Sequence, residues 1–222
     1  MPSFALISEG ITDQVVIEAV LHAVYKGSSS DDGLSVTHLQ PTRDATDYSR
    51  QDKNDFGGWQ QVLEHCSLSE HLYEAIALND FVIIHIDSDI CWHDSINIDP
   101  NQISMELISS IELLILSKID GSFLKMHRDK IILAVAIHST ECWVIPFYSS
   151  VEADRNKINS CEAKLAEILA KNKIIFKKDY NCFMSLAKPL RKKKHLEDAM
   201  ACSPSLSHFV SALPIPAPPP DH

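Results

Sequence analysis

The chain has 222 residues, 45% of them hydrophobic and 23% charged, and a formal net charge of −10. This composition is typical of a globular protein that buries its own core, and it excludes a disordered chain. The net negative charge argues against a protein that coats nucleic acid non-specifically. Only 6 glycines are present, and the absence of a G-x-G-x-x-G or Walker-type loop argues against a glycine-rich nucleotide-binding fold.

Apolar runs and helical periodicities alternate along the first two-thirds of the chain. The runs that predict strands cover residues 4–8, 34–39, 81–86 and 130–137. Apolar residues at helical spacing predict helices at 13–25, 59–65, 69–78 and 101–119. After the last strand, only helices are predicted, at 159–172, 179–187, 192–201 and 204–213. Strands alternating with helices predict an α/β fold whose parallel sheet is flanked by helices on both faces.

The pattern divides the chain into three predicted parts. Residues 1–150 form the α/β domain, residues 151–213 a helical C-terminal extension, and residues 214–222 an extended Pro-rich tail. A polar loop over residues 40–58 carries Arg43, Arg50 and Lys53, and the pattern is equally compatible with a loop that reaches a substrate over the sheet edge and with a mobile surface loop.

The cysteines and the apolar runs indicate a location. The six cysteines are irregularly spaced and form no C-x-x-C pair, so we expect neither a zinc knuckle nor a disulfide scaffold. The apolar run at 103–119 contains too many polar residues to cross a bilayer, and no signal peptide is visible. We therefore expect a protein of the reducing cytoplasm that has no membrane partner.

Acidic residues follow three of the predicted strands. Glu9 follows the first strand, Asp87 and Asp89 the third, and Glu141 lies a few residues beyond the fourth. Parallel strands present their carboxyl ends at one edge of the sheet, which is where such folds bind ligands. Carboxylates gathered there need a countercharge, and oxygen ligands favour Mg²⁺ or Mn²⁺ over zinc.

The spacing of these acids suggests the role that each would have in a metal site. On an extended segment residues i and i+2 face the same way, so Asp87 and Asp89 would both face one ion. Gly10 permits a tight turn into the next helix and the close approach of a phosphate. Asp13 is equally compatible with capping that helix and with a role in the site, and Glu141 with starting a helix. His85, inside a buried strand, is expected to be a core histidine with its hydrogen bonds satisfied.

At these residues the sequence resembles the toprim superfamily, whose signature is a Glu-Gly after the first strand and an Asp-x-Asp after the third. Here the motifs read I-S-E-G-I-T-D at residues 7–13 and I-I-H-I-D-S-D at residues 83–89. A later segment, E-C-W-V-I-P-F at residues 141–147, is similar to the E-A-W-L-L-A-D of stand-alone toprim-like bacterial proteins. Phe147 replaces the final acid of that motif, which removes any metal role there.

The resemblance implies a metal-dependent nuclease akin to the catalytic domains of OLD-family nucleases. Glu9 would act as general base or metal ligand, and Asp87 and Asp89 would hold Mg²⁺ or Mn²⁺. Asp13 and Glu141 would help to place a second ion. The resemblance alone implies a role in anti-phage defence, in which an ATPase is the expected protein partner.

A dense basic run near the C-terminus is the second functional candidate. Residues 171–194 carry nine Lys or Arg against one acid, a net +8, which leaves −18 on the rest of the chain. Its densest part is expected either to grip the backbone of DNA or RNA or to be a solvated helix face. That part consists of Lys188, Arg191, Lys192, Lys193 and Lys194.

Three other interpretations remain open. A toprim-like binding module that has lost activity would act through a protein partner. A haloacid-dehalogenase-like phosphatase also uses Asp-x-Asp, but normally after its first strand. His93-Asp94 is similar to the His-Asp pair of metal phosphohydrolases, although the further ligands of that family cannot be placed. The three tryptophans are expected in the core or in a site wall.

Overall fold

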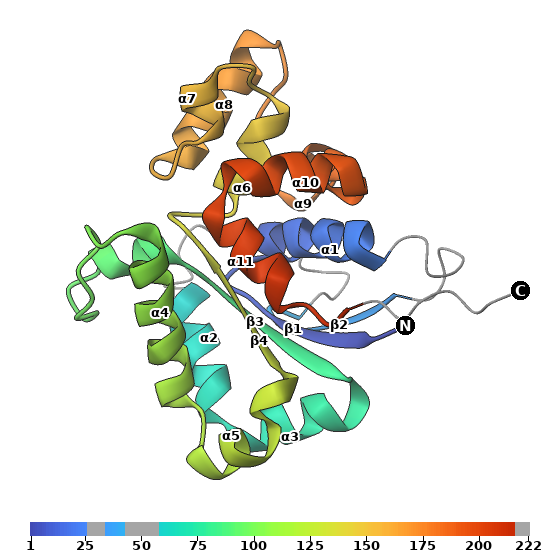
Figure 1. Cartoon of the computed structure of the whole chain (residues 1–222), viewed down its shortest axis with the longest axis vertical. Helices are drawn as coiled ribbons and strands as arrows, with labels where there is room; N and C mark the ends of the chain where they lie inside the picture. Colours follow the sequence, from blue (N-terminus) through green and yellow to red (C-terminus); the bar gives the residue numbers. More distant parts are fainter. Residues whose placement is uncertain (26–33, 43–57, 216–222) are drawn as a thin grey trace, which may run out of the picture.

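The computed structural model describes residues 1–25, 34–42 and 58–215 as an α/β fold (Figure 1). Its sheet has four strands in the order β2-β1-β3-β4, and every neighbouring pair is parallel. The strands are β1 (Ser3–Ile7), β2 (Ser35–Gln40), β3 (Phe81–Asp87) and β4 (Ile131–Ala136). The predicted α/β class is therefore confirmed, and the strand order reverses between β1 and β3, where ligands bind in open parallel sheets.

The strand side chains alternate between two hydrophobic clusters. In β3, Val82, Ile84 and Ile86 belong to one cluster, and Ile83 belongs to the other. The same alternation divides β4, where Ile132 and Leu133 face opposite ways. Both faces of the sheet are therefore buried, which explains why β3 and β4 are almost continuously apolar.

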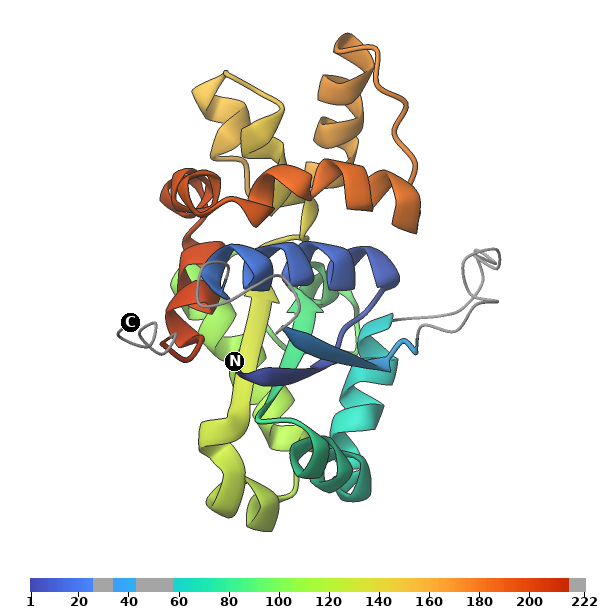
Figure 2. The ribbon, with the colours of Figure 1, turned by 90° about the vertical axis from the view of Figure 1, so that its right-hand side faces the viewer.

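Helices cover each face of the sheet. The face that carries Ile83 is covered by α1 (Ile11–Tyr25), α9 (Tyr180–Leu186), the 3₁₀ helix η4 (Lys188–Arg191), α10 (Lys193–Cys202) and α11 (Pro204–Ala212). The other face is covered by α2 (Gly58–Ser67), α3 (Ser69–Leu78), α4 (Ser104–Lys118) and α5 (Gly121–His127). Figures 1 and 2 show these two helical layers on either side of the sheet.

The remaining described elements are short except α8, the one of them that falls within a predicted helix, at residues 159–172. The 3₁₀ helix η1 (Ser88–Trp92) continues directly from β3, and η2 (Arg128–Lys130) precedes β4. After β4 come α6 (Glu141–Val144), η3 (Ile145–Phe147), α7 (Glu152–Arg155) and α8 (Cys161–Lys171). Figures 1 and 2 place α7 and α8 at the end of the molecule opposite to α3 and α5.

The C-terminal helices share a core with the sheet. One buried cluster joins Phe4 of β1 and Val20 of α1 to Leu165 of α8, Leu196 of α10 and Phe209 of α11. Helix α11 also packs along β4. The predicted extension over residues 151–213 therefore contributes to the main hydrophobic core.

Two predicted segments lie wholly or mostly outside the described residues. They are the stretch that carries Arg43, Arg50 and Lys53, and the end of the Pro-rich tail from residue 216. Among the described helices, none is both long and apolar enough to cross a membrane.

Candidate metal centre

Glu9 and Asp87 meet at the point where the strand order reverses. The parallel pairing of β1 with β3 aligns Ile7 with Ile84, so the residues after β1 lie beside the end of β3. The backbone N–H of Asp87 donates a 2.6 Å hydrogen bond to Oε1 of Glu9. Two acids that are far apart in sequence are thus held side by side at the carboxyl edge of the sheet.

Asp13 joins them from the first turn of α1. It is the third residue of that helix, and its Oδ1 accepts a 2.6 Å hydrogen bond from the Thr140 hydroxyl. Asp13 thus links the helix to the segment after β4, and it does not occupy the N-cap position. A Cβ on Gly10 would lie 3.2 Å from Oδ2 of Asp13, so the glycine leaves room for this carboxylate.

His85 is part of the same cluster, and the expectation of a satisfied core histidine is wrong. The residue is fully buried, and neither ring nitrogen has a hydrogen-bond partner. Its Nε2 lies 3.2 Å from Oδ1 of Asp87, which also lacks a hydrogen bond. The ring edge faces Trp143, with ring centroids 6.3 Å apart.

The extended reading of Asp87-Ser88-Asp89 is also wrong. Strand β3 ends at Asp87, and Asp89 lies in the 3₁₀ helix η1, where strand alternation no longer applies. The i, i+2 pair on one face of the strand is instead His85 with Asp87. Asp89 nevertheless lies beside the segment after β4, because its N–H donates a 3.3 Å hydrogen bond to the carbonyl oxygen of His138. Burial raises the pKa of its carboxyl group.

Glu141 lies at the start of α6 and is paired with a lysine. The residue is 1% exposed, and its Oε1 lies 3.4 Å from Nζ of Lys178, while its Oε2 has no hydrogen-bond partner. Lys178 is also bound to Oε2 of Glu162 at 2.9 Å. Burial lowers the pKa of Lys178, but Glu141 and Glu162 raise it by more, so the lysine stays charged. It is the countercharge that the gathered acids require.

Gathering these acids in a buried site raises the pKa of two carboxyl groups. Burial, followed by the charge of Asp87, raises the pKa of Glu9 well above its ordinary value. Burial, followed by the charges of Asp13 and Glu141, does the same for Asp87. A divalent cation would offset this effect by binding the ionised carboxylates.

The donor atoms fit such a cation. In the described part of the chain, Asp13, His85 and Asp87 form a group whose ligand atoms all lie within 4.8 Å of one another. Glu9, Asp89 and Glu141 surround this group without belonging to it. Buried polar groups are normally hydrogen-bonded, so the bare nitrogens of His85 and Oδ1 of Asp87 are what a metal site exposes to its ion.

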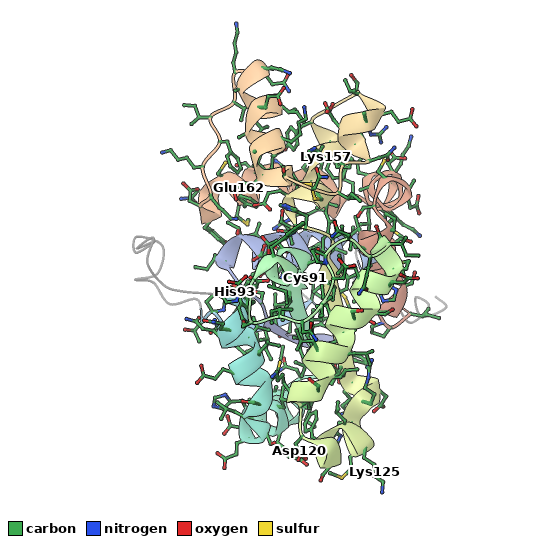
Figure 3. All side chains as sticks on the ribbon, turned by 90° about the vertical axis from the view of Figure 1, so that its left-hand side faces the viewer. Cys91, His93, Asp120, Lys125, Lys157 and Glu162 are labelled. Atoms are coloured by element: carbon green, nitrogen blue, oxygen red, sulfur yellow. A yellow bond between two sulfur atoms is a disulfide. The ribbon has the colours of Figure 1, made fainter. Side chains whose placement is uncertain are left out.

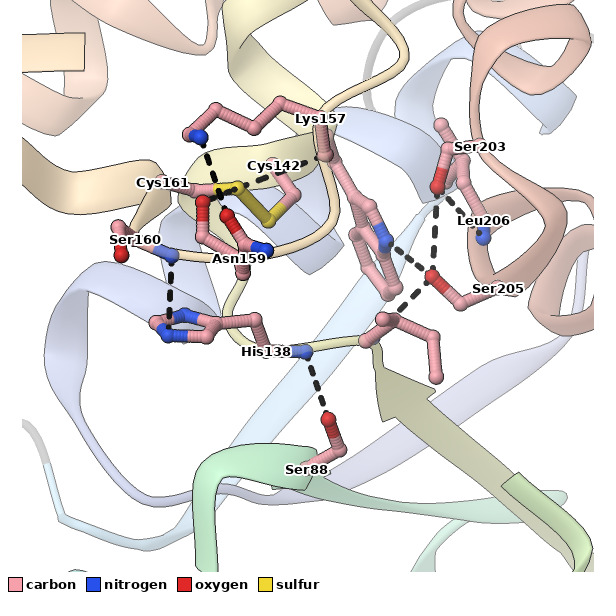
Figure 4. The surroundings of a disulfide bond; sticks show 12 residues. Ser88, His138, Cys142, Lys157, Asn159, Ser160, Cys161, Ser203, Ser205 and Leu206 are labelled. Carbon is pink, nitrogen blue, oxygen red and sulfur yellow. Dashed lines mark hydrogen bonds between the residues drawn. A yellow bond between two sulfur atoms is a disulfide. The ribbon is translucent and has the colours of Figure 1, made fainter. Parts of the chain in front are cut away.

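His138 borders the cluster in a strained conformation. Its φ of 60° lies in the left-handed region, which is rare outside glycine and is often retained at functional sites. Figure 4 shows what holds it: its N–H donates to the Ser88 hydroxyl at 2.6 Å, and its Nε2 accepts from the Ser160 N–H at 3.1 Å. Its Nδ1 is buried and without a partner.

A disulfide joins Cys142 to Cys161 beside this histidine (Figure 4). It links α6, directly after Glu141, to the first residue of α8. This bond contradicts the expectation that the cysteines form no disulfide framework. Irregular spacing carried no signal, because the two cysteines come together only when α8 packs against α6.

A cavity of about 170 Å³ opens next to His138. Trp92, which is 67% exposed, forms part of the wall of this cavity, whereas Trp143 is fully buried in the core. Amide side chains supply further polar groups in the lining, from Asn101, Gln102 and Asn159. In Figure 3, Cys91 and His93 lie at mid-height, between Lys157 and Glu162 above and Asp120 and Lys125 below.

The basic run lies in η4 and at the start of α10. Lys188, Lys192, Lys193 and Lys194 are exposed, and Arg191 is half-buried. Element η4 packs against α1, the helix that carries Asp13. A nucleic-acid role for these side chains stays a prediction.

Sequence reasoning found the acids but missed the side chains that contact them. His85, Lys178 and Thr140 contact the predicted acids directly. A signal for His85 existed in the strand alternation, since it precedes Asp87 by two residues. Lys178 and Thr140 reach the site through tertiary packing alone. Comparisons of the chain with protein-family models, with curated proteins and with solved structures found no match.

Proposed function

We propose that this protein is a metal-dependent nuclease that hydrolyses nucleic-acid phosphodiester bonds. The observation that carries the proposal is the convergence of Glu9, Asp13 and Asp87 with buried His85 at the carboxyl edge of the sheet. The toprim resemblance supports the same activity from two sequence motifs that end at this edge.

The bound cation, Mg²⁺ or Mn²⁺, would polarise the phosphodiester and offset the charge that develops on the leaving oxygen. Asp13 and Asp87 would hold it, with His85 as a further ligand.

Glu9 is suited to activate the attacking water. Burial, followed by the charge of Asp87, raises the pKa of its carboxyl group in the metal-free protein, which is the direction that a general base requires. The Asp87 N–H occupies Oε1, which holds the side chain in place and leaves Oε2 for the water proton.

Two features supply binding for an anionic polymer. Lys178 contributes a fixed positive charge next to Glu141. The cavity beside His138 offers an exposed tryptophan face and amide groups, which suit a nucleobase. The basic run from Lys188 to Lys194 would bind the phosphate backbone farther along the same nucleic acid.

The test is cleavage of plasmid DNA, single-stranded DNA and RNA with Mn²⁺ or Mg²⁺ present. Glu9→Gln and Asp87→Asn should each lower the rate at least about 100-fold, since each removes a base or a ligand. Glu112→Gln is the matched control, because this glutamate lies on α4 and pairs with His208 outside the site. Cleavage that persists in both site variants would refute the proposal.

The role in anti-phage defence and the ATPase partner rest on the resemblance alone. If the purified chain cleaves no substrate, an inactive module that acts through a protein partner becomes the better explanation.

A further inference from the structure

We infer that His85 is a metal ligand, and that the site is therefore a mixed nitrogen and oxygen centre that prefers Mn²⁺ to Mg²⁺. This inference deepens the proposed function, because it concerns the metal on which that function depends. It also names a residue that neither the acidic motifs nor the resemblance assigns.

The first support is the environment of the imidazole. His85 is fully buried, and both ring nitrogens lack a hydrogen-bond partner. A buried polar group without a partner costs about 1–3 kcal/mol, so proteins rarely leave one. A ring with two bare nitrogens next to two carboxylates is explained if one nitrogen binds a cation.

The second support is where the ring points. Residues 83, 85 and 87 share one face of β3, and Asp13 approaches that face from α1. Nε2 of His85 lies 3.2 Å from Oδ1 of Asp87. One donor atom each from Asp13, His85 and Asp87 lies within 4.8 Å of the others, close enough for a single ion to contact all three.

The donor set decides between metals. Magnesium favours oxygen ligands in a strict octahedron and retains several waters, whereas imidazole suits transition metals. A centre with one imidazole and two carboxylates should thus discriminate against Mg²⁺. Of the two ions considered for phosphodiester hydrolysis, Mn²⁺ accepts an imidazole nitrogen more readily than Mg²⁺ does.

The alternative is that His85 is a protonated partner of Asp87 and binds no metal. The 3.2 Å separation is compatible with that pair too. The two readings differ in what they predict for the metal-bound protein.

The decisive measurement is pulsed electron paramagnetic resonance of Mn²⁺ bound to the wild-type chain, which detects a directly coordinated ¹⁴N nucleus. We expect a ¹⁴N coupling typical of imidazole, and competition in which Mg²⁺ displaces Mn²⁺ only at more than about tenfold excess. Bound Mn²⁺ without a nitrogen coupling would overturn the inference, as would equal affinity for the two ions.

Variants give an independent check by Mn²⁺ titration. His85→Ala should weaken Mn²⁺ binding more than about tenfold, since loss of even an outer-shell partner costs 10–100-fold. His85→Asp should restore binding with a preference shifted toward Mg²⁺. His65→Gln is the control, because that half-buried histidine lies in α2 outside the cluster.

These outcomes separate the inference from the nuclease proposal. A nitrogen-ligated Mn²⁺ in a chain that cleaves nothing would leave the inference standing and remove the nuclease. Cleavage supported equally by both ions, with no nitrogen signal, would do the reverse.

Discussion

Asp87 and Glu9 make the stability of the metal-free protein depend on pH. Burial and neighbouring acids raise the pKa of both carboxyl groups in the folded chain. The folded state then binds protons more tightly than the unfolded state, so the free energy of unfolding falls as pH rises. The fall begins near the ordinary carboxyl pKa of about 4 and ends above the raised values.

Asp87→Asn should therefore stabilise the metal-free protein at alkaline pH and reduce the loss of unfolding free energy as pH rises above the ordinary carboxyl pKa of about 4. The same change should weaken stabilisation by Mn²⁺, because it removes a ligand. Urea unfolding with chelator, and then with Mn²⁺, measures both effects. Glu197→Gln, an exposed change on α10, should alter neither. A variant less stable than the wild type at high pH would contradict the electrostatic account.

Gly58 controls the position of Glu9 from the neighbouring helix. A Cβ at this first residue of α2 would lie 2.5 Å from the carbonyl oxygen of Glu9 and 2.9 Å from its Cβ. Gly58→Ala must therefore push α2 away from the end of β1, which should cost about 1–3 kcal/mol of the free energy of unfolding and shift Glu9.

Gly121→Ala is the matched control, because a Cβ there meets nothing within 4 Å at the start of α5. It should be neutral or stabilise by up to about 1 kcal/mol. Thermal unfolding, with and without Mn²⁺, compares the two variants. If the two variants had the same melting temperature, α2 would be able to move away from Glu9 at little cost in the free energy of unfolding.

At the scale of elements, local pattern predicts strands well and their ends poorly. The apolar runs at 81–86 and 130–137 identify β3 and β4, because strands buried on both faces must be apolar throughout. Yet β3 includes Asp87 and stops there. Since side chains alternate, this end point decides that His85, and not Asp89, shares the face of Asp87.

No local sequence pattern predicts which elements that are distant in the chain will contact one another. Lys178 reaches Glu141, and Cys142 reaches Cys161, only because α8 and its following loop pack beside α6. The acids, in contrast, follow strands, and the topology of a parallel sheet brings strand ends together. This is why the sequence located the carboxylates and missed Lys178 and the disulfide beside them.

The disulfide should stabilise both the fold and the site. It closes a loop across a sequence separation of 19 residues, for which the chain-entropy estimate is roughly 3 kcal/mol. It also positions α8, whose Glu162 holds Lys178 and whose preceding Ser160 N–H holds His138.

The double change Cys142→Ser/Cys161→Ser should therefore lower the melting temperature by about 6–12 °C in a chain of this size. Mn²⁺ binding should weaken as well. Cys202→Ser, which changes a cysteine outside the bond, is the control. Calorimetry of the oxidised proteins compares their melting temperatures. A double variant with the melting temperature of the wild type would show that the disulfide contributes little to stability.

The whole molecule carries its charge unevenly. The segment of net +8 at residues 171–194 contrasts with −18 on the remainder. It includes Lys178 at the acidic cluster and the exposed lysines of η4 and α10. An acidic protein that binds nucleic acid needs such a local positive strip, because the rest of its surface repels phosphate.

Charge reversal of this strip tests whether it binds a polyanion or is only a solvated helix face. Lys192→Glu/Lys193→Glu/Lys194→Glu should weaken DNA binding in chelator and reduce the slope of log K against log salt by about 3, if each lysine contacts one phosphate of a duplex. Lys118→Glu/Lys125→Glu/Lys130→Glu makes the same change in net charge on α4, α5 and η2. If the two variants lose affinity equally, net charge governs binding and the strip is not an interface. Loss in the first variant alone assigns the backbone contact to the start of α10.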